Sequence, residues 1–129
     1  MSFSADLAAF AAKAGESLDK TVRMVAVDLG SAIIKSTPRD TGRAMGNWQT
    51  TTGTPAADEI DRTGESGALA ELKQNVGGVG TVTYITNNLP YIMRLEQGWS
   101  DQSPPYAMVR GNMARIQQNI AEAVRKNKV

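Results

Sequence analysis

The sequence predicts an α+β fold, in which a long N-terminal helix and a C-terminal helix pack on a small antiparallel sheet, with a long polar loop. Apolar residues recur every three or four positions over 4–36 and again over 106–128, which is the period of an amphipathic helix. Two short segments between them, 44–52 and 79–88, are rich in residues that favour strands. The 129 residues fit one domain, 1–129.

The predicted N-terminal helix has Ser4 at the N-cap position, and Pro38 ends it because the residue before a proline avoids the α region. Gly15 and Gly30 are expected to mark a bend or a close contact. Such a helix is longer than a small domain needs, so part of it is expected to pack against a neighbouring subunit. Its apolar stripe consists of Leu7, Phe10, Ala14, Leu18, Val22, Val25, Leu29 and Ile33.

The first predicted strand, 44–52, places Trp48 and Thr50 on one face. Its other face would carry Met45, Asn47, Gln49 and Thr51. A long polar loop at about 53–78 follows. Within it, residues 67–74 predict a short helix with Ser66 as its N-cap. Leu69 and Leu72 of this helix would face inward. Loops of this length are usually functional or disordered.

The second strand, 79–88, is expected to close at the pair Asn87 and Asn88. Residues 89–98 then predict a short helix with a proline near its first turn and Gly98 after its end. The final helix ends in Arg125 and Lys126, whose charges suit the negative end of the helix dipole. Its apolar stripe consists of Val109, Met113, Ile116, Ile120 and Val124.

The composition argues against catalysis. Cysteine and histidine are both absent, so disulfides, thiolate metal sites and the commonest general base are excluded. We predict no enzyme activity, no cofactor and no metal. Asp40 and Glu96 form the best candidate pair of carboxylates, but hydrogen bonding to the backbone or to an arginine suits them better. The glycines of 76–80 have no following helix or lysine, so they predict a strand edge rather than a P-loop.

Formal net charge is only +1, but the charges are unevenly distributed. Residues 51–72 are acidic and residues 110–129 are basic, a pattern that permits head-to-tail stacking although such charges are usually just solvated. No apolar run approaches the ~20 residues of a membrane span, and the first residues do not resemble a signal peptide. We therefore expect a soluble protein made in the cytoplasm, with no membrane partner.

The segment "PRDTGRAMGNW", residues 38–48, predicts a corner between the long helix and the first strand. Aspartate and threonine side chains bond their own backbone in turns, and glycine tolerates positive φ. The corner is favoured over an anion-binding site, which stays the alternative. Its residues are Pro38 as the helix stop and Asp40, Thr41 and Gly42 as the turn.

The segments "STPRDTGRAMGNWQ" and "YITNNLPYIMRLEQGWSDQSPPYAMVR" resemble a family of tailed-bacteriophage proteins: the tail-component or neck proteins, including the minor tail protein Z type. Three signatures occur in order over about 18–125: a helix ending in Pro-x-Asp-Thr-Gly-Arg before a tryptophan strand, Asn-Asn-x-x-Tyr followed by Leu-Glu-x-Gly, and Ser-x-Gln-x-Pro before a last helix. Many relatives have a glycine directly after the proline-rich loop, where this chain has "PPYAM", and the acidic loop 51–72 matches no family motif.

The resemblance implies a structural protein of the virion, at the head–tail junction. It implies a ring, with a hexamer favoured, around genomic DNA that passes without sequence-specific contact. Its neighbours would be head-completion and tail-terminator or tail-tube proteins. Such a ring needs a heterologous interface that closes, for which the long first helix and the loop 53–78 are candidates.

A tail-terminator ring remains open as an alternative, as does a small nucleic-acid-binding regulator that uses the basic last helix. Glu96 is expected to accept hydrogen bonds from the 38–43 corner or from an arginine. The candidate core or interface anchors are Trp48, Tyr84, Tyr91, Glu96 and Gly98. The candidate contacts to the DNA channel or to a partner are Arg115, Arg125 and Lys126.

Overall fold

The computed structural model describes the backbone of residues 3–39, 41–98 and 104–127, and within these ranges it describes side chains between 18 and 121. The α+β class is confirmed. The elements in chain order are α1 (Phe3–Ser36), α2 (Arg43–Gly46), β1 (Trp48–Thr52), α3 (Glu65–Asn75), β2 (Thr83–Asn87), α4 (Ile92–Glu96) and α5 (Arg110–Asn127).

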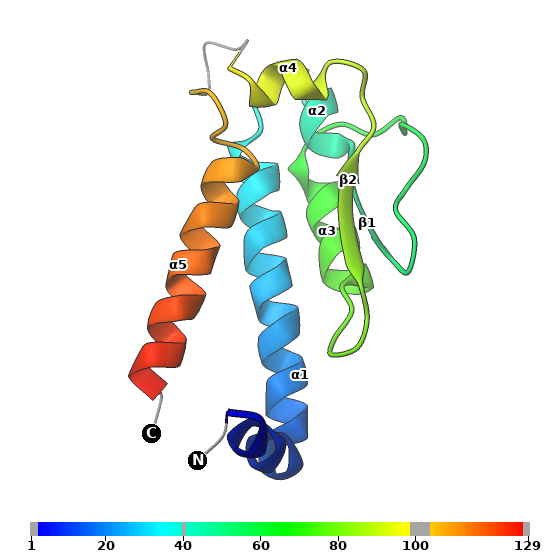
Figure 1. Ribbon diagram of the computed structural model, residues 1–129. Helices are drawn as coiled ribbons and strands as arrows, with labels where there is room; N and C mark the ends of the chain where they lie inside the picture. The colour runs from blue at the N-terminus through cyan, green and yellow to red at the C-terminus, as the bar shows by residue number, and fades with distance from the viewer. Residues whose placement is uncertain (1–2, 40, 99–103, 128–129) are drawn as a thin grey trace.

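The central helix α1 separates α5 from the sheet and α3, while α2 and α4 gather at one end of the molecule (Figure 1). The strands β1 and β2 pair antiparallel, with Trp48 opposite Asn87 and Thr52 opposite Thr83. Helix α3 packs on β1 and on α1, and α5 packs on α1. The core therefore lies between α1, α3 and the sheet and extends to the start of α5. Its buried members are Ile33, Ile34, Trp48, Ala68, Leu72 and Met108.

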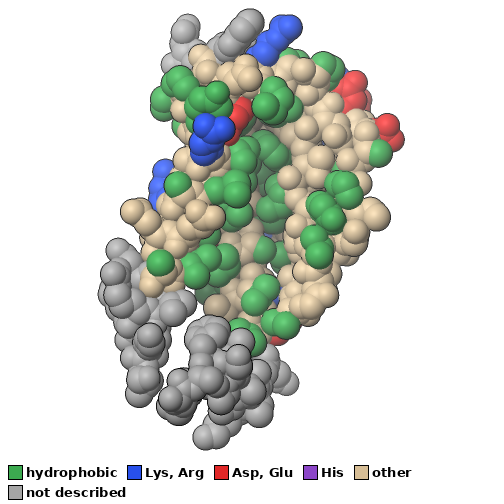
Figure 2. All heavy atoms as spheres, in the orientation of Figure 1, with side chains coloured by type: hydrophobic (Ala, Val, Ile, Leu, Met, Phe, Trp, Pro, Cys, Tyr) green, Lys and Arg blue, Asp and Glu red, His purple; other side chains and the backbone are tan. Residues whose placement is uncertain are grey.

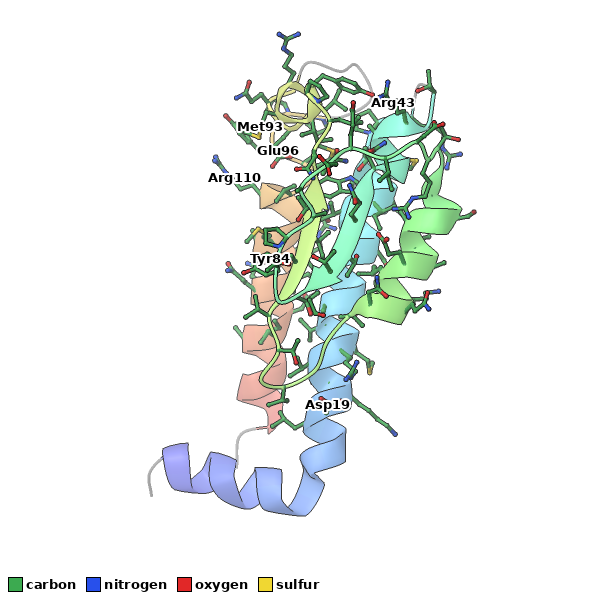
Figure 3. All side chains as sticks on the ribbon, turned by 90° about the vertical axis from the view of Figure 1, so that its right-hand side faces the viewer. Asp19, Arg43, Tyr84, Met93, Glu96 and Arg110 are labelled. Carbon is green, nitrogen blue, oxygen red and sulfur yellow. The ribbon has the colours of Figure 1, made fainter. Side chains whose placement is uncertain are left out.

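The long first helix matches its predicted bounds closely. A Cβ on Gly30 would lie 2.7 Å from Leu72 Cδ1, so the expectation of a close contact is confirmed at this glycine. The absent side chain lets α1 and α3 approach each other. The helix also bends on the N-terminal side of Asp19 (Figure 3), which agrees with the bend expected near Gly15.

The first strand begins at Trp48 and not at residue 44, because one helical turn, α2, precedes it. Gly42 adopts φ +82 and its carbonyl accepts the Gly46 N–H at 3.0 Å, which starts that turn. Asn47 ends it by donating from Nδ2 to the Arg43 carbonyl at 2.9 Å. The predicted alternation of faces before Trp48 is therefore wrong. Within the strand, Gln49 and Thr50 lie on opposite faces and are both buried, so both faces of the strand are covered there.

The long segment 53–78 is not a continuous loop, because α3 occupies its second half and contributes Ala68 and Leu72 to the core. The helix is preceded by Gly64, and Ser66 lies inside its first turn, so the predicted cap is wrong. Leu72 faces inward as predicted and is fully buried.

Helix α5 begins at Arg110 and not at Tyr106, because Tyr106 has a φ of +60 and a right-handed helix cannot start there. Its predicted stripe is only partly covered, since Met113 is 44% and Ile120 40% exposed. The side chain of Val124 lies outside the described residues. None of the helices in the described ranges is long and apolar enough to span a bilayer.

Candidate interaction site

The corner after α1 is a structural joint. Pro38 is buried, and the Thr41 hydroxyl accepts the Arg43 N–H at 3.3 Å. The Gly42 carbonyl accepts from Gly46 and also from Gly64, the latter at 2.8 Å, so the turn holds the end of the 53–64 loop. A Cβ on Gly42 would lie 3.0 Å from the Gly64 nitrogen. Asp40 lies outside the described residues.

Trp48 fixes the start of β1 against the end of α1. Its indole Nε1 donates to the Thr37 hydroxyl at 2.8 Å, and Thr37 donates onward to the Ile33 carbonyl at 2.8 Å. The tryptophan is only 6% exposed and belongs to the core cluster. The structure thus places Trp48 as a core anchor.

The asparagine pair at the end of β2 joins the second signature to the corner. Asn87 Nδ2 donates to the Ala44 carbonyl of α2 at 2.9 Å, and Asn87 Oδ1 accepts the Leu89 N–H at 3.2 Å. Asn88 Nδ2 donates to the carbonyls of Ala56 and Asp58, at 2.9 and 3.2 Å. The pattern of the sequence indicates only the end of a strand here, because the partners are backbone carbonyls 30 or more residues away.

Glu96 caps the last helix. Its Oε1 accepts the Val109 N–H and its Oε2 accepts the Arg110 N–H, each at 3.0 Å, and the side chain is buried in the last turn of α4. A carboxylate satisfies the free amides at a helix N-terminus and complements the dipole. Glu96 was expected to accept from the 38–43 corner or from an arginine. It does accept from an arginine, but through the backbone N–H of Arg110 and not from the corner, because the free amides at the start of α5 occupy both of its oxygens. Glu96 joins the second signature to the helix that follows the third.

The turn before α5 is compact. The Tyr106 N–H donates to the Glu96 carbonyl, and the Tyr106 ring lies under the Arg110 guanidinium, 4.1 Å from its centroid. Tyr106 is the only non-glycine residue with positive φ among those described. Gly98 has φ +97, and a Cβ there would meet Pro105 Cγ at 2.7 Å. Both the conformation and the contact therefore require glycine at position 98.

The other two aromatic anchors lie nearer the surface. Tyr84 is partly buried on β2, opposite Thr51. Tyr91 is partly buried before α4, and its carbonyl accepts the N–H groups of Arg94 and Leu95 at 3.1 and 3.3 Å. Neither belongs to the core cluster, so both remain candidates for an interface.

An apolar groove opens between the sheet, α4 and the start of α5, with a volume of about 360 Å³. Figure 2 shows hydrophobic side chains gathered in a hollow on this face, and Figure 3 shows Met93, Glu96 and Arg110 at its end. Met93 is 62% exposed at the opening. The lining residues are Trp48, Asn87, Ile92, Met93, Glu96, Tyr106, Met108, Val109, Arg110 and Met113.

Arg62 holds the 53–64 loop to the corner and is absent from the sequence-based candidates. It donates from Nε to the Gly46 carbonyl at 2.7 Å and from Nη2 to the Trp48 carbonyl at 2.8 Å. Its guanidinium also pairs with Glu71 at 3.3 Å, and Glu71 accepts the Thr50 N–H. Nothing in the local pattern distinguishes this arginine from a solvated one.

Asn112 ties α5 to the end of α1 and was likewise missed. It is 1% exposed and donates from Nδ2 to the Met108 carbonyl at 2.6 Å and to the Ser36 hydroxyl at 3.1 Å. A polar residue inside an apolar stripe is the only signal that marks it. Arg115 donates to Asn112 Oδ1 at 3.0 Å. The side chains of Arg125 and Lys126 lie outside the described residues, so the predicted grouping of Arg115, Arg125 and Lys126 stays a prediction.

Comparisons with protein-family models, with curated proteins and with solved structures found no match to this chain. Among the described residues, no group of three or more Asp or Glu side chains is placed to hold a metal ion. The geometry of the groove is suited to contact with another macromolecule: an apolar floor, a methionine at the opening and one arginine at the rim.

Proposed function

We propose that this protein is a structural component of a tailed-phage virion, at the head–tail connector, where it forms or joins a ring around the DNA channel. The neck or tail-completion position is favoured, and a tail-terminator ring is the nearest alternative. One observation carries the proposal: parts of the first two signatures and the segment that follows the third, which are distant in sequence, contact one another around a single groove.

The contacts between signatures are specific. Asn87 of the second signature bonds the α2 turn of the first, and Glu96 of the second caps the helix that follows the third. Trp48 of the first signature, Asn87 of the second and Tyr106, which follows the third, line the same groove. A motif set with no shared structural role would have no reason to converge.

The chemistry around the groove favours a scaffold. Glu96 is the one carboxylate among the lining residues, and both of its oxygens are occupied by the α5 amides. Arg110 is stacked on Tyr106. A general base needs a free acceptor within reach of a substrate proton, and this carboxylate has a structural task instead.

The test is a phage from which the gene is deleted. We expect filled heads and separate tails that fail to join, seen by electron microscopy, and loss of infectivity that the cloned gene restores. A deletion phage that makes joined, infectious particles would refute the proposal.

The nucleic-acid-binding alternative is tested on the purified protein. It predicts DNA affinity that falls steeply with salt and that is lost when Arg115, Arg125 and Lys126 are changed to alanine. The connector proposal instead predicts that these changes leave weak DNA binding at low salt little altered and alter particle assembly.

A further inference from the structure

The 53–64 loop presents carboxylates that form no ion pair with the described residues. Asp58 and Asp61 are exposed, and no cation of the described residues lies within ion-pair distance of either. Glu59, between them, pairs with Arg43 at 3.3 Å. The loop therefore has a negative outer edge that stays available to another molecule.

The same loop is held in one conformation by side chains in and next to the two strands. Gln49 Nε2 donates to the Asp58 carbonyl at 2.7 Å, and the Ile60 N–H donates to Asn47 Oδ1 at 2.8 Å. Asn88 holds the carbonyl of Ala56. A loop that is ordered before binding loses less conformational entropy when a partner binds it. A loop that only connected two elements would not need these hydrogen bonds.

The groove edge has the opposite charge. Arg110 lies at the rim, and Arg94 and Arg115 lie on the neighbouring turns of α4 and α5, all three exposed. Glu96 is the only acid in these two helices among residues with described side chains, and it is buried under the α5 amides. Complementary charge on two surfaces selects partners and speeds their encounter.

The two surfaces lie on different sides of the molecule. The loop projects at the right-hand edge of Figure 1, whereas Met93, Glu96 and Arg110 lie at the left in Figure 3, where the right-hand side of Figure 1 faces the viewer. Two complementary patches on different sides of one chain can join copies head to tail, and such a heterologous contact closes into a ring when the rotation between copies allows it.

We propose that residues 54–61 of the 53–64 loop of one copy dock in the apolar groove of the next. Pro55 and Ala57, both exposed, lie over the groove floor, and Asp58 and Asp61 face Arg110 at its rim. The inference rests on the proposed function in one respect, because a ring requires a head-to-tail contact between copies. The loop and the groove are the two surfaces that make this contact.

The first experiment is directed crosslinking, because the chain has no cysteine of its own. Met93→Cys and Ala57→Cys change exposed positions on the two surfaces. We expect the two single variants, mixed and oxidised, to give a disulfide-linked heterodimer in high yield. Lys73→Cys on exposed α3 replaces Ala57→Cys in the control and should give little product. Equal yields from the two mixtures would overturn the proposal.

The second experiment reverses the charges and measures self-association by analytical ultracentrifugation. Arg110→Glu and the pair Asp58→Arg with Asp61→Arg should each weaken association by about tenfold or more, since juxtaposed like charges cost several kcal/mol. Combining all three changes in one chain, or mixing the two variants, should restore it. Asp28→Arg, an exposed reversal on α1, is the matched control and should have no effect.

The outcomes separate this inference from the proposed function. A wild-type chain that stays monomeric at all concentrations, or an oligomer that survives both reversals, overturns loop-in-groove docking. Neither result bears on whether a phage that lacks the gene is infectious. The connector role is therefore tested by the deletion phage alone. Thermal melting of each variant confirms that lost association does not reflect unfolding.

Discussion

The indole Nε1 of Trp48 donates a 2.8 Å hydrogen bond to the hydroxyl of Thr37, which joins the first residue of β1 to the residue after α1. Thr37→Val removes the only acceptor and leaves a buried N–H unpaired, so it should lower the free energy of unfolding by about 1–3 kcal/mol. Thr37→Ser keeps the hydroxyl and should cost less. Urea denaturation measures both.

A double-mutant cycle adds a stricter test of the same bond. Trp48→Phe together with Thr37→Val removes both partners, so the second change should cost much less in the phenylalanine background than in wild type. Additive costs would show that the bond contributes nothing.

Glu96 holds the start of α5, so its loss should loosen that helix locally. Glu96→Ala should destabilise the protein by about 1–3 kcal/mol, because a cap is lost and buried amides lose a partner. Glu96→Gln retains one acceptor and should have a smaller effect. Hydrogen exchange of the Val109 and Arg110 amides is the direct measurement. Unchanged protection of these amides in Glu96→Ala would contradict the assignment.

Gly42→Val should destabilise the corner through both backbone strain and contact. A β-branched residue at φ +82 is strained by about 1–3 kcal/mol, and a Cβ would lie 3.0 Å from the Gly64 nitrogen. Gly53→Val is the matched control, because Gly53 has φ +85 but no atom within 4 Å of a Cβ. The difference between the two melting temperatures isolates the contact. Equal losses would remove the role given to packing against Gly64.

Tyr106 tests whether the left-handed backbone at this position costs stability. At φ +60, Tyr106→Gly should be more stable than Tyr106→Ala by about 1 kcal/mol, because alanine keeps the left-handed strain that glycine avoids. Both variants lose the ring under Arg110 equally. Denaturant midpoints for the two variants decide the matter, and alanine above glycine would be the contrary result.

Asp19 makes one contact of the structure sensitive to acid. The Arg23 side chain, with the Val79 amide as a second donor, holds the pKa of the Asp19 carboxyl below its ordinary value of 3.8. The stabilisation is therefore present above that value and is lost as the pH falls through the lower folded pKa. The Val79 amide shift in NMR should titrate with a midpoint below 3.8, and Asp19→Asn should abolish the titration. A midpoint at or above 3.8 would argue against the contact.

The glycines before β2 show why the contact between Asp19 and Val79 cannot be predicted from the sequence. A Cβ on Gly78 would overlap Asp19 Oδ1, and the Arg23 guanidinium bonds the Val76 carbonyl at 2.7 Å. The sequence predicts only a strand edge at 76–80, since glycine by itself does not say which surface approaches it. The approach comes from α1, about sixty residues earlier.

The sequence by itself determined the features that depend on local periodicity and local stereochemistry. The extent of α1, its end before Pro38, the left-handed turn at Gly42 and the existence of two strands and a last helix all follow from residues within a few positions of one another. The close approach at Gly30 was also predictable in kind, because a glycine inside an apolar stripe marks either a bend or a contact.

Only the tertiary structure decided where Asn87, Glu96 and Arg62 direct their hydrogen bonds. Each satisfies backbone groups between 13 and 43 residues away. The free carbonyls and amides at helix and strand ends are the same at every position of a chain, so no sequence pattern names the partner. The groove also depends on these long-range hydrogen bonds. It forms where the sheet, α4 and the start of α5 meet, and residues far apart in the sequence hold these segments together.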